Sequence, residues 1–421
     1  MNGRSRQSSD RLSGAVEKRK RGGNMRKQAA ALRWVYLALG TAALLFAGIL
    51  YAWSILKTPL AAEFNWSASA LSVNFMLTMC CFCVGGMLGG FLTKRLGLRI
   101  ACLVGACLAG SGFLLASRMG GGIGLLYLSY GVLAGLGIGI AYNCIISTIN
   151  GWFPDKKGLA TGVLMMGFGA STLVLGSAAD AMIRNPAFGW RGAFRIIGVS
   201  LGIVLALVAF VFRKAPESAP AARSDHAREA KDYTTAEMLK TAAFWKALFM
   251  IVFLAAGGNA VISIAKDLAV SVGLASAAAT VLVGILSVCN GFGRILTGAA
   301  FDRFGLRRTM IAAGVLAVLA SATVLSAILW RSPVLIITGL CLTGLSYGTC
   351  PTIGSAFTSS AFGAKNFPMN FAVMNCNLIF ASFIAAGANV INASAGGYVA
   401  GFSLLFALSA AALLLGCSMK S

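Results

Sequence analysis

The residue with the clearest chemical potential in this sequence is a single arginine inside an apolar segment. Arg294 lies within the stretch Val281–Arg308, eight residues before Asp302, where the sequence predicts that a charged loop begins. At about 1.5 Å per helical residue, Arg294 would lie roughly 12 Å inside a membrane whose apolar core is about 30 Å thick. A guanidinium at that depth costs at least about 2.5 kcal/mol, so it needs a polar cavity or a partner.

The sequence offers Arg294 no counter-ion nearby, because no Asp or Glu lies between Val281 and Asp302. A fixed cation of this kind predicts an anionic ligand. A carboxylate fits, because the planar guanidinium can hold both carboxylate oxygens and stays charged when water is removed. The alternative is an arginine that donates to backbone carbonyls and only ties helices together.

Polar side chains in other apolar segments are candidates to complete a site around Arg294. Tyr142-Asn143 and Tyr347 are expected near mid-depth, about nine and fourteen residues from the ends of their segments at about 1.5 Å per residue. A phenol and an amide at that depth can donate to a carboxylate. Further candidates are Tyr51, Asn259, Asn290 and Asn375. For each of them, a hydrogen bond that only joins two helices is the alternative.

The segments that must position these residues are transmembrane helices. Of the 421 residues, 58% are hydrophobic and only 11% are charged, and apolar runs of helix-spanning length recur throughout. This composition predicts an all-α membrane protein with twelve spans. The expected spans are Leu32–Leu56, Ser67–Thr93, Leu98–Ser117, Ile123–Ile149, Gly158–Ala179, Gly192–Phe212, Phe244–Ala265, Ala275–Phe301, Thr309–Leu329, Pro333–Ser360, Phe367–Ile391 and Gly396–Gly416.

These spans divide the chain into two bundles of six helices. We expect a basic tail at residues 1–31, bundles at 32–213 and 244–417, a polar linker at 214–243 and a short tail at 418–421. Within the linker, Thr234-x-x-Glu237 predicts a capping box that opens a helix.

Charge predicts the orientation of the chain in the membrane. Most of the 35 Lys and Arg residues fall on one side of the spans, which places both termini in the cytoplasm of a cell membrane. The net charge of +23 therefore indicates topology rather than nucleic-acid binding. The basic tail is expected to be disordered and is suited to contact with anionic lipid.

No pattern in the sequence predicts a cofactor, a metal or an enzyme site. All 11 cysteines lie in apolar segments, and the single histidine, His226, lies in the linker, so Cys80-Cys81-x-Cys83 is read as packing. Gly135-x-Gly137-x-Gly139 has no preceding strand or P-loop lysine and indicates close helix packing.

The two halves carry a repeated loop. Gly90-x-x-x-Lys94-Arg95-x-Gly97-x-Arg99 aligns with Gly298-x-x-x-Asp302-Arg303-x-Gly305-x-Arg307 at an offset of 208 residues. Gly135-Leu136, Gly139 and Phe153 align with Gly344-Leu345, Gly348 and Phe362 at an offset of 209. A parallel duplication of six spans is the layout of many secondary transporters.

On these residues the chain resembles the major facilitator superfamily. The second loop is a full copy of that superfamily's signature, whereas the first has Lys94 where the family has an acid. The resemblance implies a twelve-helix carrier in which the two halves rock about a central site, with the two loops stabilising one closed state.

Shorter strings resemble the oxalate:formate antiporter family, which is close to the monocarboxylate transporters. The strings are Tyr51-Ala52-Trp53-Ser54, the run Trp152–Gly162, Gly189-Trp190-Arg191, Asn290-Gly291-x-x-Arg294 and Phe362-Gly363-x-Lys365-Asn366. This resemblance implies transport of small organic anions, with Arg294 as the carboxylate anchor.

Two differences from these families narrow the choice of substrate and of coupling mode. The oxalate carrier has a second cation in the eleventh helix, but no Lys or Arg lies between Lys365 and Lys420 here. The proton-coupled carriers have an aspartate one turn before the arginine, where this chain has Asn290. We therefore expect formate, lactate or pyruvate ahead of oxalate, and exchange or uniport ahead of proton symport. The coupling partner, a proton or a counter-anion, is left open.

Two other functions remain as alternatives. One is a sensor or scaffold in the membrane that keeps the fold without transport. The other is a proton-coupled drug efflux carrier, although such carriers usually rely on carboxylates buried in their helices.

Overall fold

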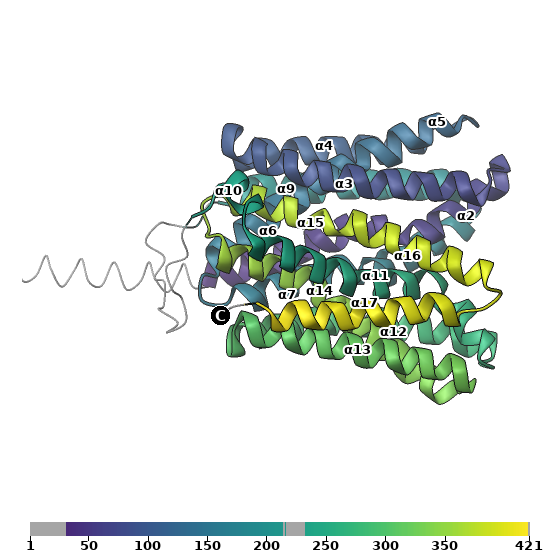
Figure 1. The fold of residues 1–421 in the computed structure, drawn as a ribbon. Coiled ribbons are helices and arrows are strands. Elements are labelled where there is room, and N and C mark those ends of the chain that lie inside the picture. The colour runs from purple at the N-terminus through teal and green to yellow at the C-terminus, as the bar shows by residue number, and fades with distance from the viewer. Residues whose placement is uncertain (1–30, 214, 216–231, 420–421) are drawn as a thin grey trace, which may run out of the picture.

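The computed structural model describes residues 31–213, 215 and 232–419, and in these residues the secondary structure is helical. Twelve helical segments in this part of the chain are long and apolar enough to cross a membrane, which confirms the predicted all-α class. They run side by side along one axis (Figure 1). In lipid every backbone N–H and C=O must be paired within the protein, and helices achieve this within each segment.

The first six spans contain several changes of helix type. Residues 31–47 are helical and continue into the 3₁₀ turn η1 and then α2. The fourth and fifth spans contain the π-helical segments η2 and η3. The elements are η1 (Gly48–Ala52), α2 (Trp53–Phe64), α3 (Ala68–Leu96), α4 (Leu98–Ala116), α5 (Ile123–Leu126), η2 (Tyr127–Ala134), α6 (Gly135–Trp152), α7 (Lys157–Ser171), η3 (Thr172–Gly176), α8 (Ser177–Arg184) and α9 (Gly189–Val211).

The last six spans follow a short helix, α10, that precedes them. The elements are α10 (Thr235–Leu239), α11 (Ala242–Ser271), α12 (Ser276–Phe304), α13 (Leu306–Trp330), α14 (Pro333–Ala361), α15 (Phe367–Asn375), α16 (Asn377–Ser394) and α17 (Val399–Cys417). Buried apolar side chains form two clusters, one within residues 36–212 and one within residues 238–419. Phe367 and Phe371 of α15 join the first cluster and so connect the halves.

Several expected helix ends were wrong; the fifth and seventh spans, for example, continue to Arg184 and Ser271. The first span continues through Lys57-Thr58-Pro59 to Phe64 and ends at Asn65, whose φ of 53° is left-handed. Pro59 lacks only its own N–H, and neighbouring helices allow a transmembrane helix to keep such a proline.

The expected end of α12 was also wrong, because this helix includes Asp302 and ends at Phe304, followed by Gly305 with φ of 80°. The eleventh span is interrupted at Cys376 instead of running unbroken from Phe367. The Asn377 amide donates to the carbonyl of Met374 at 2.7 Å, a local bond that competes with the helical pattern.

The predicted capping box is present at the start of α10. The backbone N–H of Glu237 donates to Thr234 Oγ1, and the backbone N–H of Thr234 donates to Glu237 Oε2. Just before it, the backbone N–H of Tyr233 donates to the carbonyl of Phe362 at 3.1 Å. This contact holds the start of the second half against the turn between α14 and α15. We call the end of the bundle where this turn lies the linker end; it lies on the left in Figure 1.

The two halves pack closely at the linker end through glycines of the repeated loops. A Cβ on Gly298 would lie 2.2 Å from the carbonyl oxygen of Gly158, so α12 and α7 touch backbone to backbone. A Cβ on Gly90 would lie 3.1 Å from the backbone of Pro368 and Met369, where α3 meets α15. The aligned glycines of the two loops thus make matching contacts between the halves.

Asp302 adds a polar contact to only one of these two junctions. Its carboxylate accepts the N–H groups of Gly158 and Leu159, at 3.0 and 2.8 Å, at the first turn of α7. A negative charge there satisfies unpaired donors and opposes the positive end of the helix dipole. Lys94, its counterpart in the other loop, has no oxygen with which to accept such bonds.

The remaining residues of the loop motif shape the turns. Gly97 and Gly305 have φ of 87° and 80°, a conformation that glycine adopts without strain, and each connects two consecutive helices. Arg95 and Arg303 lie over the rings of Phe91 and Phe304 at 5.5 and 5.2 Å. Arg99 and Arg307 lie exposed in the first turns of α4 and α13.

The Gly158–Gly298 contact predicts a sharp intolerance of side chains. Gly298→Val should lower the melting temperature of the purified protein by several degrees, because overpacking a tight contact costs about 1–3 kcal/mol. Gly284→Val in the same helix is the matched control, since a Cβ there meets nothing within 4 Å. Equal melting temperatures for the two variants would contradict the close packing of α7 and α12.

Candidate functional site

Arg294 is almost fully buried between the two halves, with 3% of its surface exposed. Its Nε donates to Asn290 Oδ1 at 3.3 Å, and its Nη1 donates to the backbone carbonyl of Met165 in the other half. Among the described residues, Arg294 forms no ion pair with an acid. The guanidinium therefore has hydrogen-bond partners but no neutralising charge.

Glycine makes room for this arginine. A Cβ on Gly169 would lie 3.0 Å from Arg294 Cζ, so the guanidinium packs against the bare backbone of α7. A Cβ on Gly162 would lie 2.5 Å from the carbonyl oxygen of Arg294, and Thr352 donates to that oxygen at 3.3 Å. Contacts from α7 and α14 thus fix both the side chain and the backbone of Arg294.

Arg294 lines a small cavity of about 20 Å³ that both halves enclose. A space of that size holds about one water molecule. The site is therefore closed up around the guanidinium in this conformation. The lining residues are Tyr51, Phe82, Tyr142, Phe168, Arg294, Tyr347, Cys350, Pro351, Asn375, Asn377 and Leu378.

The structure brings together six of the residues that the sequence suggested for a site. Tyr51, Tyr142, Tyr347 and Asn375 line the cavity with Arg294. Asn290 touches Arg294 from one helical turn away but does not itself line the cavity.

The three phenols lie around the guanidinium. Tyr51, Tyr142 and Tyr347 line the same cavity as Arg294. Tyr142 packs edge-on against Phe82 and Phe168, with ring centroids 5.1 Å apart in each case. The arrangement offers one cation and several hydroxyl donors inside an aromatic wall, which suits a small anion with an apolar body.

Asn143 lies elsewhere and has a structural role. Its amide nitrogen donates to the carbonyls of Gly86 and Pro368 at 2.9 and 2.7 Å, and its oxygen accepts from Ser147. It therefore ties α6 to α3 and to α15. Asn259 is half-buried in α11, does not line the Arg294 cavity, and forms no hydrogen bond with another described residue.

Sequence reasoning missed several residues of the site. Asn377 lines the cavity beside Asn375, and Met165 supplies the carbonyl that Arg294 binds. Pro351 lies inside α14 and has no N–H for the carbonyl of Tyr347, a signal that was visible in the sequence. Gly169 and Met165 gave no signal, because their role depends on which helix of the other half faces Arg294.

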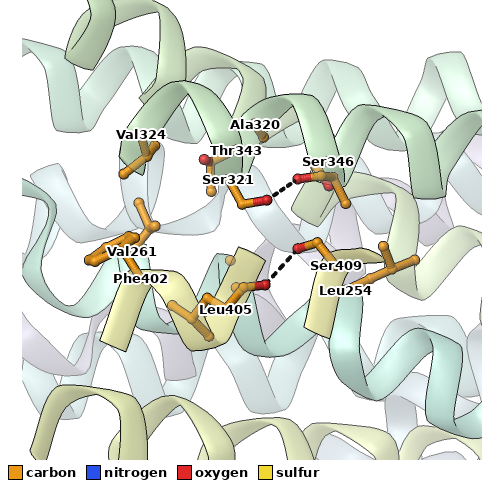
Figure 2. A pocket seen from close by; sticks show the side chains of 13 residues that line it. Leu254, Val261, Ala320, Ser321, Val324, Thr343, Ser346, Phe402, Leu405 and Ser409 are labelled. Carbon is orange, nitrogen blue, oxygen red and sulfur yellow. Dashed lines mark hydrogen bonds between the residues drawn. The ribbon is translucent and has the colours of Figure 1, made fainter. Parts of the chain in front are cut away.

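A second cavity of about 20 Å³ lies inside the C-terminal half, among α11, α13, α14 and α17 (Figure 2). Its lining contains only aliphatic, small, hydroxyl and one phenylalanine side chains. Ser321 and Ser409 donate to the carbonyls of Ala317 and Leu405 on their own helices, at 2.8 and 2.9 Å. With no charged group in its wall, this cavity lacks the means to hold an anion.

A model of the Major Facilitator Superfamily matches residues 37–375, which is most of the chain. The chain belongs to the major facilitator superfamily. Solved structures of transporters have the same fold. The proton:xylose symporter XylE superposes with a TM-score of 0.73 at 15% identity, and the superposition covers 91% of this chain and 95% of XylE. The transporter FucP in its outward conformation gives a TM-score of 0.66 at 14% identity, covering 91% and 99%.

Two relatives with curated names are also transporters. The oxalate:formate antiporter of Oxalobacter formigenes is 29% identical over 363 residues, covering 84% of each chain. Monocarboxylate transporter 12 of Mus musculus is 28% identical over 273 residues, covering 59% of this chain and 55% of that one. The resemblance predicted from the sequence is confirmed, and this member of the superfamily is a multi-pass membrane transporter, not an enzyme.

The structural role of Asn143 predicts a loss of stability when its amide is removed. Asn143→Leu leaves the carbonyls of Gly86 and Pro368 without this donor, at a cost of about 1–3 kcal/mol. The melting temperature of the purified protein should fall, whereas Asn259→Leu, which breaks no hydrogen bond between described residues, should leave it nearly unchanged. The reverse order of the two melting temperatures would contradict the assignment.

Proposed function

We propose that this protein carries a small monocarboxylate, such as formate, lactate or pyruvate, across the membrane by alternating access, with Arg294 as the group that binds the carboxylate. The observation that supports it most is the buried Arg294 charge, which contacts both halves and has no acid as a partner among the described residues. Burying a cation without a counter-charge is costly, and an anionic substrate removes that cost when it binds.

The charge of the site favours a monoanion. Arg294 is the one charged residue in the cavity wall, and the sequence contains no Lys or Arg between Lys365 and Lys420. One fixed cation balances one carboxylate, whereas a dianion such as oxalate would keep a net negative charge in a desolvated site. The names of the relatives, an oxalate:formate antiporter and a monocarboxylate transporter, agree with this class of substrate.

The Met165 carbonyl suggests how binding is coupled to movement. It occupies a donor of Arg294 that the substrate needs, and it belongs to the half that must move relative to α12. We infer that an incoming carboxylate displaces this carbonyl, neutralises the guanidinium and thereby weakens the junction of α7 with α12. Tyr51, Tyr142 and Tyr347 then orient the anion, together with Asn375 and Asn377 of the cavity wall.

The same geometry favours exchange or uniport over proton symport. Asn290 is the side chain that touches Arg294 Nε, and an amide does not take up a proton at physiological pH. The cavity wall contains no Asp, Glu or His, so proton-linked drug efflux has no carboxylate there to use. By the excess of Lys and Arg, the linker end faces the cytoplasm of a cell membrane.

The first experiment is a counterflow assay in proteoliposomes with labelled formate, lactate, pyruvate and oxalate. We expect uptake of at least one monocarboxylate, and a fall of at least about tenfold in Arg294→Gln, because a charge-assisted hydrogen bond contributes about 1.5–3 kcal/mol. Arg294→Lys should retain part of the uptake, since it keeps the charge but loses the planar fork.

Arg195→Gln, at an exposed position of α9, is the matched control and should transport like the wild type. Equal uptake by wild type and Arg294→Gln would reject the role of Arg294. A carboxylate-dependent rise in melting temperature without any flux would instead support a membrane sensor.

A second experiment tests the coupling. In Asn290→Asp, an ionised carboxylate would pair with Arg294 and compete with the substrate, whereas the protonated acid would not. Counterflow by this variant should therefore be slow at mildly alkaline pH and rise as the pH falls, while the wild type changes little. A flat profile in the variant would contradict the contact between residue 290 and the substrate-binding cation.

A further inference from the structure

Two cysteines from opposite halves meet beside the cavity. Cys83 lies in α3 and is buried, and Cys376 lies at the interruption between α15 and α16 and is half-buried. Cys83 Sγ donates to the carbonyl of Asn375, the residue before Cys376, at 3.6 Å. The Cys376 side chain packs against the buried cluster that contains Cys83. Neither thiol takes part in the proposed substrate site.

The register of α3 against α15 accounts for this meeting. Gly90 packs against the backbone of Pro368 and Met369, and one turn further along, a Cβ on Gly86 would lie 3.7 Å from that of Ala372. Each turn along α3 therefore matches one turn in the reverse direction along α15. The following turn brings Cys83 to Asn375 and Cys376, where the backbones are still close because Gly86 has no side chain.

Other close cysteine pairs differ in one respect. Cys102 and Cys144 lie on the packed helices α4 and α6, and Cys289 and Cys341 on the packed helices α12 and α14, so each of these pairs lies within one half of the protein. A covalent bond in either pair would leave the halves free to move. A bond between Cys83 and Cys376 would join the halves at the junction that must separate when the linker end opens.

We propose that Cys83 and Cys376 are a site of thiol oxidation, at which a peroxide forms a disulfide that locks the carrier with its linker end closed. Cys376 Sγ attacks one peroxide oxygen, the O–O bond breaks, and the released hydroxide leaves as water with the thiol proton. Cys83 Sγ then attacks the sulfenic sulfur of Cys376, and the S–O bond breaks to release a second water with the Cys83 proton. The two thiols lose two electrons, and the peroxide gains them.

The order of attack follows from exposure. Cys376 is the more exposed thiol of the pair and Cys83 is enclosed by α15, so a peroxide meets Cys376 first. Cys83 is then already in contact with the oxidised sulfur as the resolving thiol. Reduction by a dithiol reverses the bond and frees the halves.

The test uses the full-length protein with a protease site inserted in the linker between the halves. After treatment with hydrogen peroxide and cleavage, the two halves of the wild type should stay joined on a non-reducing gel and separate after dithiothreitol. Cys83→Ala and Cys376→Ala should each separate without reduction. Cys102→Ala and Cys341→Ala, which remove cysteines from pairs within one half, should stay joined like the wild type.

Flux gives the second measurement. Peroxide should reduce counterflow of the wild type at least about fivefold and dithiothreitol should restore it, while Cys83→Ala keeps its flux in peroxide. If the halves of the oxidised wild type separate, or the halves of both single variants stay joined, Cys83 and Cys376 do not form the disulfide. If the halves are joined but the flux is undiminished, the disulfide does not lock the carrier. The gel needs no substrate, so absence of all flux before oxidation would count against the proposed function and not against the disulfide.

Discussion

The structure depends on a cation that is buried where two halves of the protein meet. Arg294 reaches from α12 to the carbonyl of Met165 in α7, and no acid among the described residues balances its charge. A backbone carbonyl accepts a hydrogen bond from the guanidinium but supplies only a dipole. The positive charge of Arg294 therefore stays uncompensated. We propose that this contact holds the halves together only until a full negative charge replaces the carbonyl. In our account, substrate binding and separation of the halves are therefore one event at one side chain.

In this proposal, the glycines at the linker end allow the replacement of the Met165 carbonyl by a carboxylate to move the two halves relative to each other. Gly158 against Gly298, and Gly90 against the start of α15, bring backbones into direct contact. Such backbones make close van der Waals contact when the helices fit together, and they lose this contact when the helices tilt apart. The interface is therefore either packed or separated, with no continuous range between the two. Asp302 strengthens one junction by capping α7, whereas Lys94 leaves the other without an equivalent cap. The duplicated loops thus share their packing but differ in their electrostatics.

The sequence predicted the features that follow from the membrane alone. The twelve spans and the choice of Arg294 as a candidate both derive from the cost of placing polar groups in an apolar environment, and the repeated loops from the alignment of the two halves. Tyr51, Tyr142, Tyr347 and Asn375 were found in the same way and do line the cavity.

The predictions that failed concern residues whose contacts come from helices that are distant in the sequence. Asn143 looked like Tyr142 in the sequence, but the carbonyls of Gly86 and Pro368 take its amide. The interruption at Cys376 and the contact of Gly169 with Arg294 arise from helices that are distant in the chain.

A structure of the carrier with formate bound would test the role of Arg294 most directly. We predict the carboxylate on the Arg294 guanidinium and the Met165 carbonyl released; formate bound elsewhere, with the Arg294–Met165 bond intact, would contradict it.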